Sequence, residues 1–153
     1  MRFLVDTNVF LRFVEVDSPE FGVCDRALEA VRNGSHTACY CAQIVIEFWS
    51  VATRPRKVNG LAMSIADAQR EIEDIKMVFE CLGEPEDMAE RWQRVAVEHS
   101  VIGKQAHDAR IAALMLAHGV THLLTLNTSD FVRYQEITPA TPEEVLQLVG
   151  AAD

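Results

Sequence analysis

Residues 2–6, Arg-Phe-Leu-Val-Asp, form a short, mainly apolar run that ends on an acid. Its apolar part predicts a strand over residues 2–5, of the parallel kind that is covered on both faces. Residues 37–41 have the same character, and further strand candidates are residues 78–82, 121–126 and 135–138. In open parallel sheets, function gathers beyond the carboxyl ends of the strands, so Asp6 marks the edge where a site is expected.

Helical patterns separate these strands. Ser18-Pro19 predicts an N-cap with proline at the first helical position, and Ser64 to Asp67 resembles a capping box. Gly34 and Pro55 mark helix ends. The predicted helices cover residues 9–13, 19–33, 42–53, 65–78, 105–118 and a stretch from residue 87 onward. Strands that alternate with helices predict one α/β domain over residues 1–153, with three α/β/α layers and a parallel sheet of four to five short strands.

Charge bears on the class of partner. The 153 residues hold 14 Lys and Arg against 23 Asp and Glu, a net charge of −9. Proteins held to nucleic acid by their overall charge are normally basic. This chain should therefore repel RNA and DNA on average, unless a local basic patch or bound cations intervene. A basic protein partner would be attracted.

Several features predict a cytoplasmic protein without a membrane anchor. No apolar run approaches the roughly 20 residues that cross a bilayer. Asp6 comes too early for the apolar stretch of a signal peptide. The four cysteines include no C-x-x-C pair, so we expect reduced thiols.

Four acids stand out. Asp6 follows the first strand, Asp130 follows the strand candidate 121–126, Asp108 lies in the first turns of a helix, and Glu47 lies inside the apolar helix 42–53. The three aspartates each have a structural alternative, because acids cap helices and suit the helix dipole. Helix 42–53 is apolar on nearly every side, which predicts a buried helix and not a surface one. Glu47 is therefore different, because a buried carboxylate must pair with a base or bind a cation.

If these acids share one pocket, they require positive charge. Clustered carboxylates repel one another, and hard divalent cations such as Mg²⁺ or Mn²⁺ prefer oxygen ligands. Zinc is disfavoured because the histidines show no ligand spacing. A haloacid-dehalogenase phosphotransferase would need an acid at Asn8, and the glycine-rich nucleotide motifs and the G-x-S-x-G elbow are absent. Metal-dependent phosphodiester hydrolysis survives these exclusions.

Four segments in order resemble the motifs of PIN domains, and most of all those of VapC-type toxins. They are Leu4 to Asn8, Ile46 to Phe48, His107 to Ala113 and Leu124 to Phe131. The resemblance implies a PIN-like fold and a Mg²⁺- or Mn²⁺-dependent endoribonuclease. Attack by water on the phosphodiester would leave 5′-phosphate and 3′-hydroxyl ends. It also implies a homodimer and a cognate antitoxin that inhibits it.

The resemblance also implies roles for individual residues. The catalytic and metal-binding acids would be Asp6, Glu47, Asp108 and Asp130, supported by Thr7, Asn8, Thr125 and Asn127. Many relatives carry one more aspartate shortly before the last acid. Here that segment is Asn127-Thr128-Ser129, so occupancy by a second metal stays open.

An acidic nuclease needs local cations to hold RNA. The candidates for phosphate contact are Arg54, Arg56, Lys57, Lys104 and Arg110, which lie near Glu47 or Asp108 in the sequence. The alternative for these residues is a solvated helix end or an ordinary ion pair. Two other functions stay open: a free-standing PIN nuclease in RNA processing, and a non-catalytic PIN-fold module that binds proteins.

Overall fold

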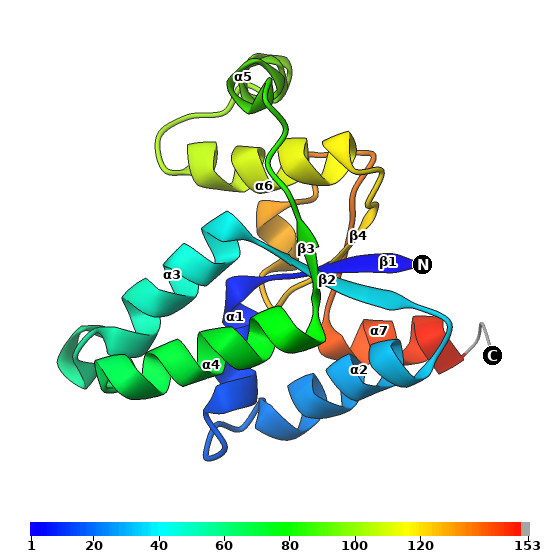
Figure 1. Ribbon diagram of the computed structural model, residues 1–153. Coiled ribbons are helices and arrows are strands. Elements are labelled where there is room, and N and C mark those ends of the chain that lie inside the picture. The colour runs from blue at the N-terminus through cyan, green and yellow to red at the C-terminus, as the bar shows by residue number, and fades with distance from the viewer. Residues whose placement is uncertain (151–153) are drawn as a thin grey trace.

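A computed structural model describes residues 1–150 and shows a sheet with helices on both faces (Figure 1). All strand pairs are parallel, and the order in the sheet is β3-β2-β1-β4-β5. The strands are β1 (Arg2–Val5), β2 (Thr37–Cys41), β3 (Glu80–Leu82), β4 (His122–Leu124) and β5 (Thr138–Ala140). The predicted α/β class and three-layer α/β/α arrangement are confirmed.

The helices form the two outer layers. They are α1 (Thr7–Val14), α2 (Phe21–Asn33), α3 (Ala42–Thr53), α4 (Ile65–Val78), α5 (Met88–Glu98), α6 (Gln105–Ala117) and α7 (Pro142–Gly150), with short 3-10 turns η1 (Arg56–Val58) and η2 (Thr128–Asp130). Figure 1 shows α5 and α6 beyond one face of the sheet, and α1, α2, α4 and α7 beyond the other. Within residues 1–150, no helix combines the length and apolarity needed to cross a membrane.

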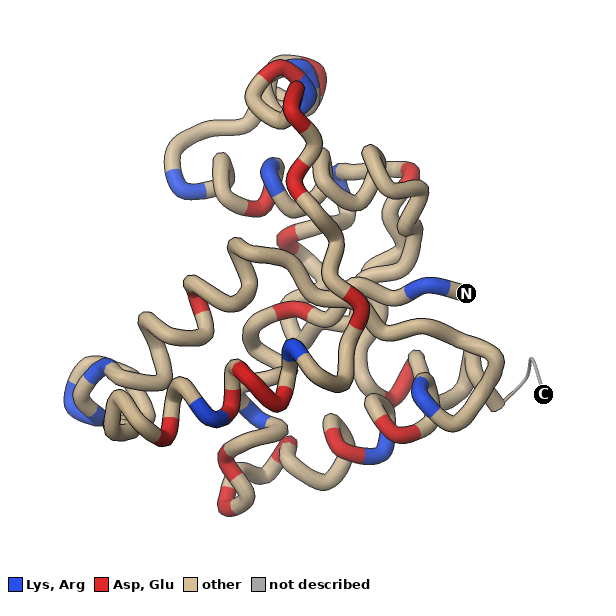
Figure 2. The backbone as a smooth tube through the Cα atoms, in the orientation of Figure 1, with Lys and Arg blue, Asp and Glu red and all other residues tan. Residues whose placement is uncertain are grey.

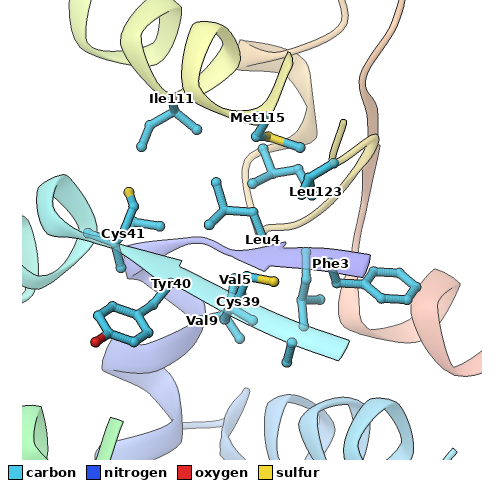
Figure 3. Packing of buried hydrophobic residues seen from close by; sticks show 14 of the residues in the cluster. Phe3, Leu4, Val5, Val9, Cys39, Tyr40, Cys41, Ile111, Met115 and Leu123 are labelled. Carbon is cyan, nitrogen blue, oxygen red and sulfur yellow. The ribbon is translucent and has the colours of Figure 1, made fainter. Parts of the chain in front are cut away.

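The central strand β1 is buried on both faces, as its composition predicts. Phe3, Leu4 and Val5 are fully buried. Leu4 and Leu123 point toward Ile111 and Met115 of α6 (Figure 3). Burying side chains of this size contributes about 1.5–3 kcal/mol each, so this packing holds the strand ends in place.

Pairing of β1 with β4 sets the position of the candidate site. Val5 is the partner of Leu124 in the ladder, and the Asp6 amide donates to the Leu124 carbonyl at 2.9 Å. The residue after β1 therefore lies beside Thr125, the residue after β4. Asp6 and Thr125 meet although 119 positions separate them.

Several predicted boundaries are wrong: α1 begins at Thr7 and not at residue 9, and β4 ends at Leu124 and not at residue 126. Helix α2 begins at Phe21 rather than at Pro19, because Ser18 closes a turn by donating its amide to the Glu15 carbonyl at 2.8 Å. The last strand comprises residues 138–140 instead of 135–138, since the Ile137 amide donates to the Tyr134 carbonyl at 2.9 Å in a turn.

Helix α7 was not predicted, although the sequence contains its start signal. Thr141 precedes Pro142, and Glu144 is the third residue of the helix. The Thr141 amide donates to the Glu144 carboxylate at 2.8 Å, and the Glu144 amide donates to the Thr141 hydroxyl at 3.3 Å. This reciprocal pair is a capping box with proline at the first helical position.

Candidate active site

Asp6 is held on both carboxylate oxygens. Oδ1 accepts from the Thr7 amide at 2.7 Å, so Asp6 caps α1. Oδ2 accepts from the Thr125 hydroxyl at 2.7 Å and from the side-chain nitrogen Nδ2 of Asn8 at 3.1 Å. Burial raises the pKa of Asp6 and outweighs the hydrogen bonds that lower it, and the neighbouring carboxylates of Glu47 and Asp130 raise it further.

Thr125 and Asn8 connect the ends of β1 and β4. Thr125 is fully buried, and its hydroxyl also accepts from Asn8 Nδ2 at 3.2 Å and from the Asn127 amide at 3.0 Å. Asn8 Oδ1 accepts from the Leu126 amide at 3.1 Å. All four predicted supporting residues thus form hydrogen bonds at the site, and Asn127 does so through its backbone alone.

Glu47 is placed by α3. Its Oε2 accepts from the Thr7 hydroxyl at 3.2 Å, and its Oε1 accepts from Gln43 Nε2 at 2.8 Å. The expectation that α3 is buried on nearly every side is wrong, because Ile46 is 68% exposed. Glu47 itself is half-buried, and no base among the described residues forms an ion pair with it.

Asp108 and Asp130 complete the set. Asp108 lies in the first turn of α6 and is half-buried, whereas Asp130 ends η2 and is exposed. Burial raises the pKa of Asp108 to about 6, and repulsion from Asp130, Asp6 and Glu47 adds to the rise. Asp108 thus lies near enough to the other three acids to be repelled by them, and Asp6 lies near enough to Glu47 and Asp130.

The four acids supply carboxylate oxygens, which are the ligands that hard divalent cations prefer. No ion pair within residues 1–150 involves any of the four acids. Figure 2 shows acidic positions on α3, on α6 and on the segment that carries η2. In the described part of the chain, no three His, Cys, Asp or Glu side chains are grouped so that they could hold a metal ion as they stand. Binding of an ion would therefore require these carboxylates to draw together.

The predicted basic cluster lies at the far end of α3. Arg54 donates to the Asn59 carbonyl at 3.1 Å, so its guanidinium supports the loop that follows α3. Arg56 faces Glu15 at 3.7 Å with a largely exposed side chain, and Lys57 is exposed. Contact of these three residues with RNA stays a prediction.

The other two predicted phosphate contacts differ from each other. Lys104 is exposed just before α6. Arg110 is engaged within the protein, because it donates to Gln43 Oε1 at 2.8 Å and also bonds to Glu84. Sequence reasoning missed Gln43, although its place four residues before Glu47, on the same face of α3, was a usable signal.

Comparisons with known proteins bear on the family and the fold of the chain. A family model described as PIN domain matches residues 3–137. A search of curated proteins finds no match.

Solved structures share the fold at low sequence identity. VapBC2 from Rickettsia felis, solved with a promoter DNA fragment, has a TM-score of 0.69 at 15% identity, covering 92% of this chain and 98% of that chain. VapBC-1 from nontypeable Haemophilus influenzae has a TM-score of 0.67 at 16% identity, covering 94% and 99%. VapC20 from Mycobacterium tuberculosis, a toxin that cleaves the sarcin–ricin loop, has a TM-score of 0.64 at 14% identity, covering 85% and 93%.

Proposed function

The chain belongs to the PIN domain family, and we propose that it is a Mg²⁺- or Mn²⁺-dependent endoribonuclease, the toxin of a VapBC-like toxin–antitoxin pair. One observation carries this proposal. Carboxylates from separate elements raise the pKa values of Asp6 and Asp108, and no Lys, Arg or His among the described residues forms an ion pair with any of the four acids.

The four acids differ in how far the protein supports them. Asp6 and Glu47 are oriented by hydrogen bonds from the protein, whereas the Asp108 and Asp130 side chains accept none within residues 1–150. Asp6, Asp108 and Asp130 would hold the ion, and Glu47 would ligate it or orient the attacking water. A bound divalent cation supplies charge stabilisation and a more acidic water.

The products follow from attack by water. Water adds to the phosphorus and the 3′ oxygen leaves, so the RNA ends are a 5′-phosphate and a 3′-hydroxyl. The 2′-hydroxyl takes no part. An exposed Lys104 at the start of α6, four residues before Asp108, is placed to contact a neighbouring phosphate.

The partner argument rests on charge and on the similar structures. VapBC2 and VapBC-1 share this fold. The net charge of −9 would attract a basic segment of an antitoxin. We expect a gene for such a protein beside this one, and a homodimer in light scattering of the purified toxin.

The test is cleavage of total RNA by the purified protein, with Mn²⁺ or with EDTA. We expect cleavage with Mn²⁺ alone and 5′-phosphate ends on the fragments. Asp6→Asn and Asp108→Asn should abolish cleavage and keep the fold, whereas Asp87→Asn, an exposed acid before α5, should cleave like the wild type. Cyclic 2′,3′-phosphate ends, or cleavage that persists in EDTA, would overturn the proposal.

Mn²⁺ should also raise the melting temperature of the wild type, because a ligand that binds only the folded state stabilises it. Asp6→Asn should lose this gain. A wild type that melts at the same temperature with and without Mn²⁺ argues instead for a non-catalytic module.

A further inference from the structure

Buried polar side chains in this protein gather at one place. Apart from tyrosines and cysteines, three polar side chains within residues 1–150 are buried, and each bonds to a candidate catalytic acid. Thr125 donates to Asp6, while Thr7 and Gln43 donate to Glu47. Burying a polar group is costly unless its bonds are made, so these three residues are placed by the site and not by the core.

Of the three, Gln43 is the residue that connects two helices of the site. It is 8% exposed and lies on the first turn of α3. Its Nε2 donates to Glu47 Oε1 at 2.8 Å and to the His107 carbonyl at 3.0 Å. His107 precedes Asp108 on α6, so one amide connects the helix of Glu47 with the helix of Asp108.

The orientation of this amide is fixed by its neighbours. A carboxylate and a carbonyl can only accept, and the guanidinium of Arg110 can only donate. Arg110 donates to Gln43 Oε1 at 2.8 Å, which directs Nε2 toward Glu47. The second arm of Arg110 bonds to Glu84, so the guanidinium itself is held.

We propose that Gln43, oriented by Arg110, is a positioning residue that fixes the carboxylate of Glu47 for metal binding and for attack on RNA. The inference rests on the proposed function. Arg110 then acts inside the protein and not on the substrate, which replaces the role expected for it from sequence. Glu84 holds the guanidinium of Arg110, Arg110 orients the amide of Gln43, and this amide orients the carboxylate of Glu47.

The first experiment measures Mn²⁺ affinity by calorimetry without RNA. Gln43→Met keeps the length of the side chain and removes the amide. Partners that orient metal ligands are worth about 10- to 100-fold in metal affinity or activity, so we expect a loss of that size. Gln69→Met, at an exposed position on α4, is the matched control and should bind Mn²⁺ like the wild type. In RNA cleavage, Gln43→Met should lower kcat and leave KM near its original value.

A double-mutant cycle separates positioning from general destabilisation. If Gln43 acts through Glu47, then Gln43→Met should cause no further loss of Mn²⁺ affinity in a Glu47→Ala background. Additive losses would overturn the inference, because independent effects add. Should Gln43→Met fail to fold, Arg110→Met removes the orienting donor without altering α3, and it should lower Mn²⁺ affinity in the wild type and not in Glu47→Ala.

The two proposals fail differently. A wild type that neither binds Mn²⁺ nor cleaves RNA overturns the proposed function and the inference with it. A wild type that does both, with Gln43→Met and Arg110→Met that match it, overturns the inference alone.

Discussion

Replacing a candidate catalytic acid should stabilise the metal-free protein. The pKa of Asp108 rises from 3.8 to about 6 on folding, through burial and repulsion from the other acids. Below 3.8 the carboxyl holds its proton in both states. Between 3.8 and about 6 the folded state keeps a proton that the unfolded chain has released, so stability falls as pH rises. Above about 6 the full penalty persists.

The magnitude follows from that rise. A pKa difference of one corresponds to about 1.4 kcal/mol, which gives about 3 kcal/mol as an upper bound. Asp108 is only half-buried, and solvent screening reduces this to about 1.5 kcal/mol. Asp108→Asn also loses the favourable interaction of an acid with the first turn of α6, about 0.5 kcal/mol. The net expectation is a gain of about 1 kcal/mol at pH 7.5.

The assay is urea unfolding in EDTA, from pH 4 to pH 8, of the wild type and of Asp108→Asn. The gain should grow between pH 4 and pH 6.5 and then stay constant. Asp87→Asn is the control of opposite sign, because the hydrogen bond from Arg91 lowers the pKa of Asp87 and stabilises its charged form. An Asp108→Asn protein that is no more stable than the wild type at pH 7.5, or a gain independent of pH, would refute the reasoning.

Two further predictions concern the scaffold. Thr125→Val removes the hydroxyl that donates to Asp6, so urea unfolding should show a loss of about 2 kcal/mol in the free energy of unfolding, and the pKa of Asp6 should rise further. Thr125→Ser keeps a hydroxyl and should recover most of that loss. A loss under about 0.5 kcal/mol in Thr125→Val would contradict the role of the hydroxyl. Gly60→Ala places a Cβ 1.9 Å from the Arg54 carbonyl oxygen and should lower the free energy of unfolding by about 1–3 kcal/mol. A Cβ at Gly83 meets no atom of residues 1–150 within 4 Å, so Gly83→Ala should be tolerated. Equal stabilities of the two variants in urea unfolding would refute the close approach at Gly60.

Local signals predicted the central elements. The bounds of β1, β2 and α3 agree with the predictions to the residue. The sequence pattern changes at each end: Asp6 follows the apolar run of β1, the helical pattern that starts at Ala42 follows β2, and Pro55 follows α3. Helix α7, which was not predicted, also has a local start signal in the capping box from Thr141 to Glu144.

The contacts inside the site are of another kind. Four acids could be named because chemistry and motif order point to them. That Arg110 bonds to Gln43, 67 positions away, depends on how α6 packs beside α3, and no spacing in the sequence reports it. The burial of α3 failed for a similar reason: its apolar composition does not reveal that Ile46 projects into solvent.

Within residues 1–150, hydrogen bonds hold the carboxylate of Asp6 but not that of Asp108, so a bound cation should order the two ends of the site to different degrees. Asp6 is fixed by bonds from Thr7, Asn8 and Thr125, at the end of the central strand. The pKa values of both acids are raised, but Asp108 accepts no such bonds within the described residues, so a cation would give it support that Asp6 already has. Binding should therefore order the start of α6 while β1 stays as it is. Amide hydrogen exchange with and without Mn²⁺ would measure this: slower exchange confined to the start of α6 and the segment of η2 agrees with it, and equal slowing at β1 does not.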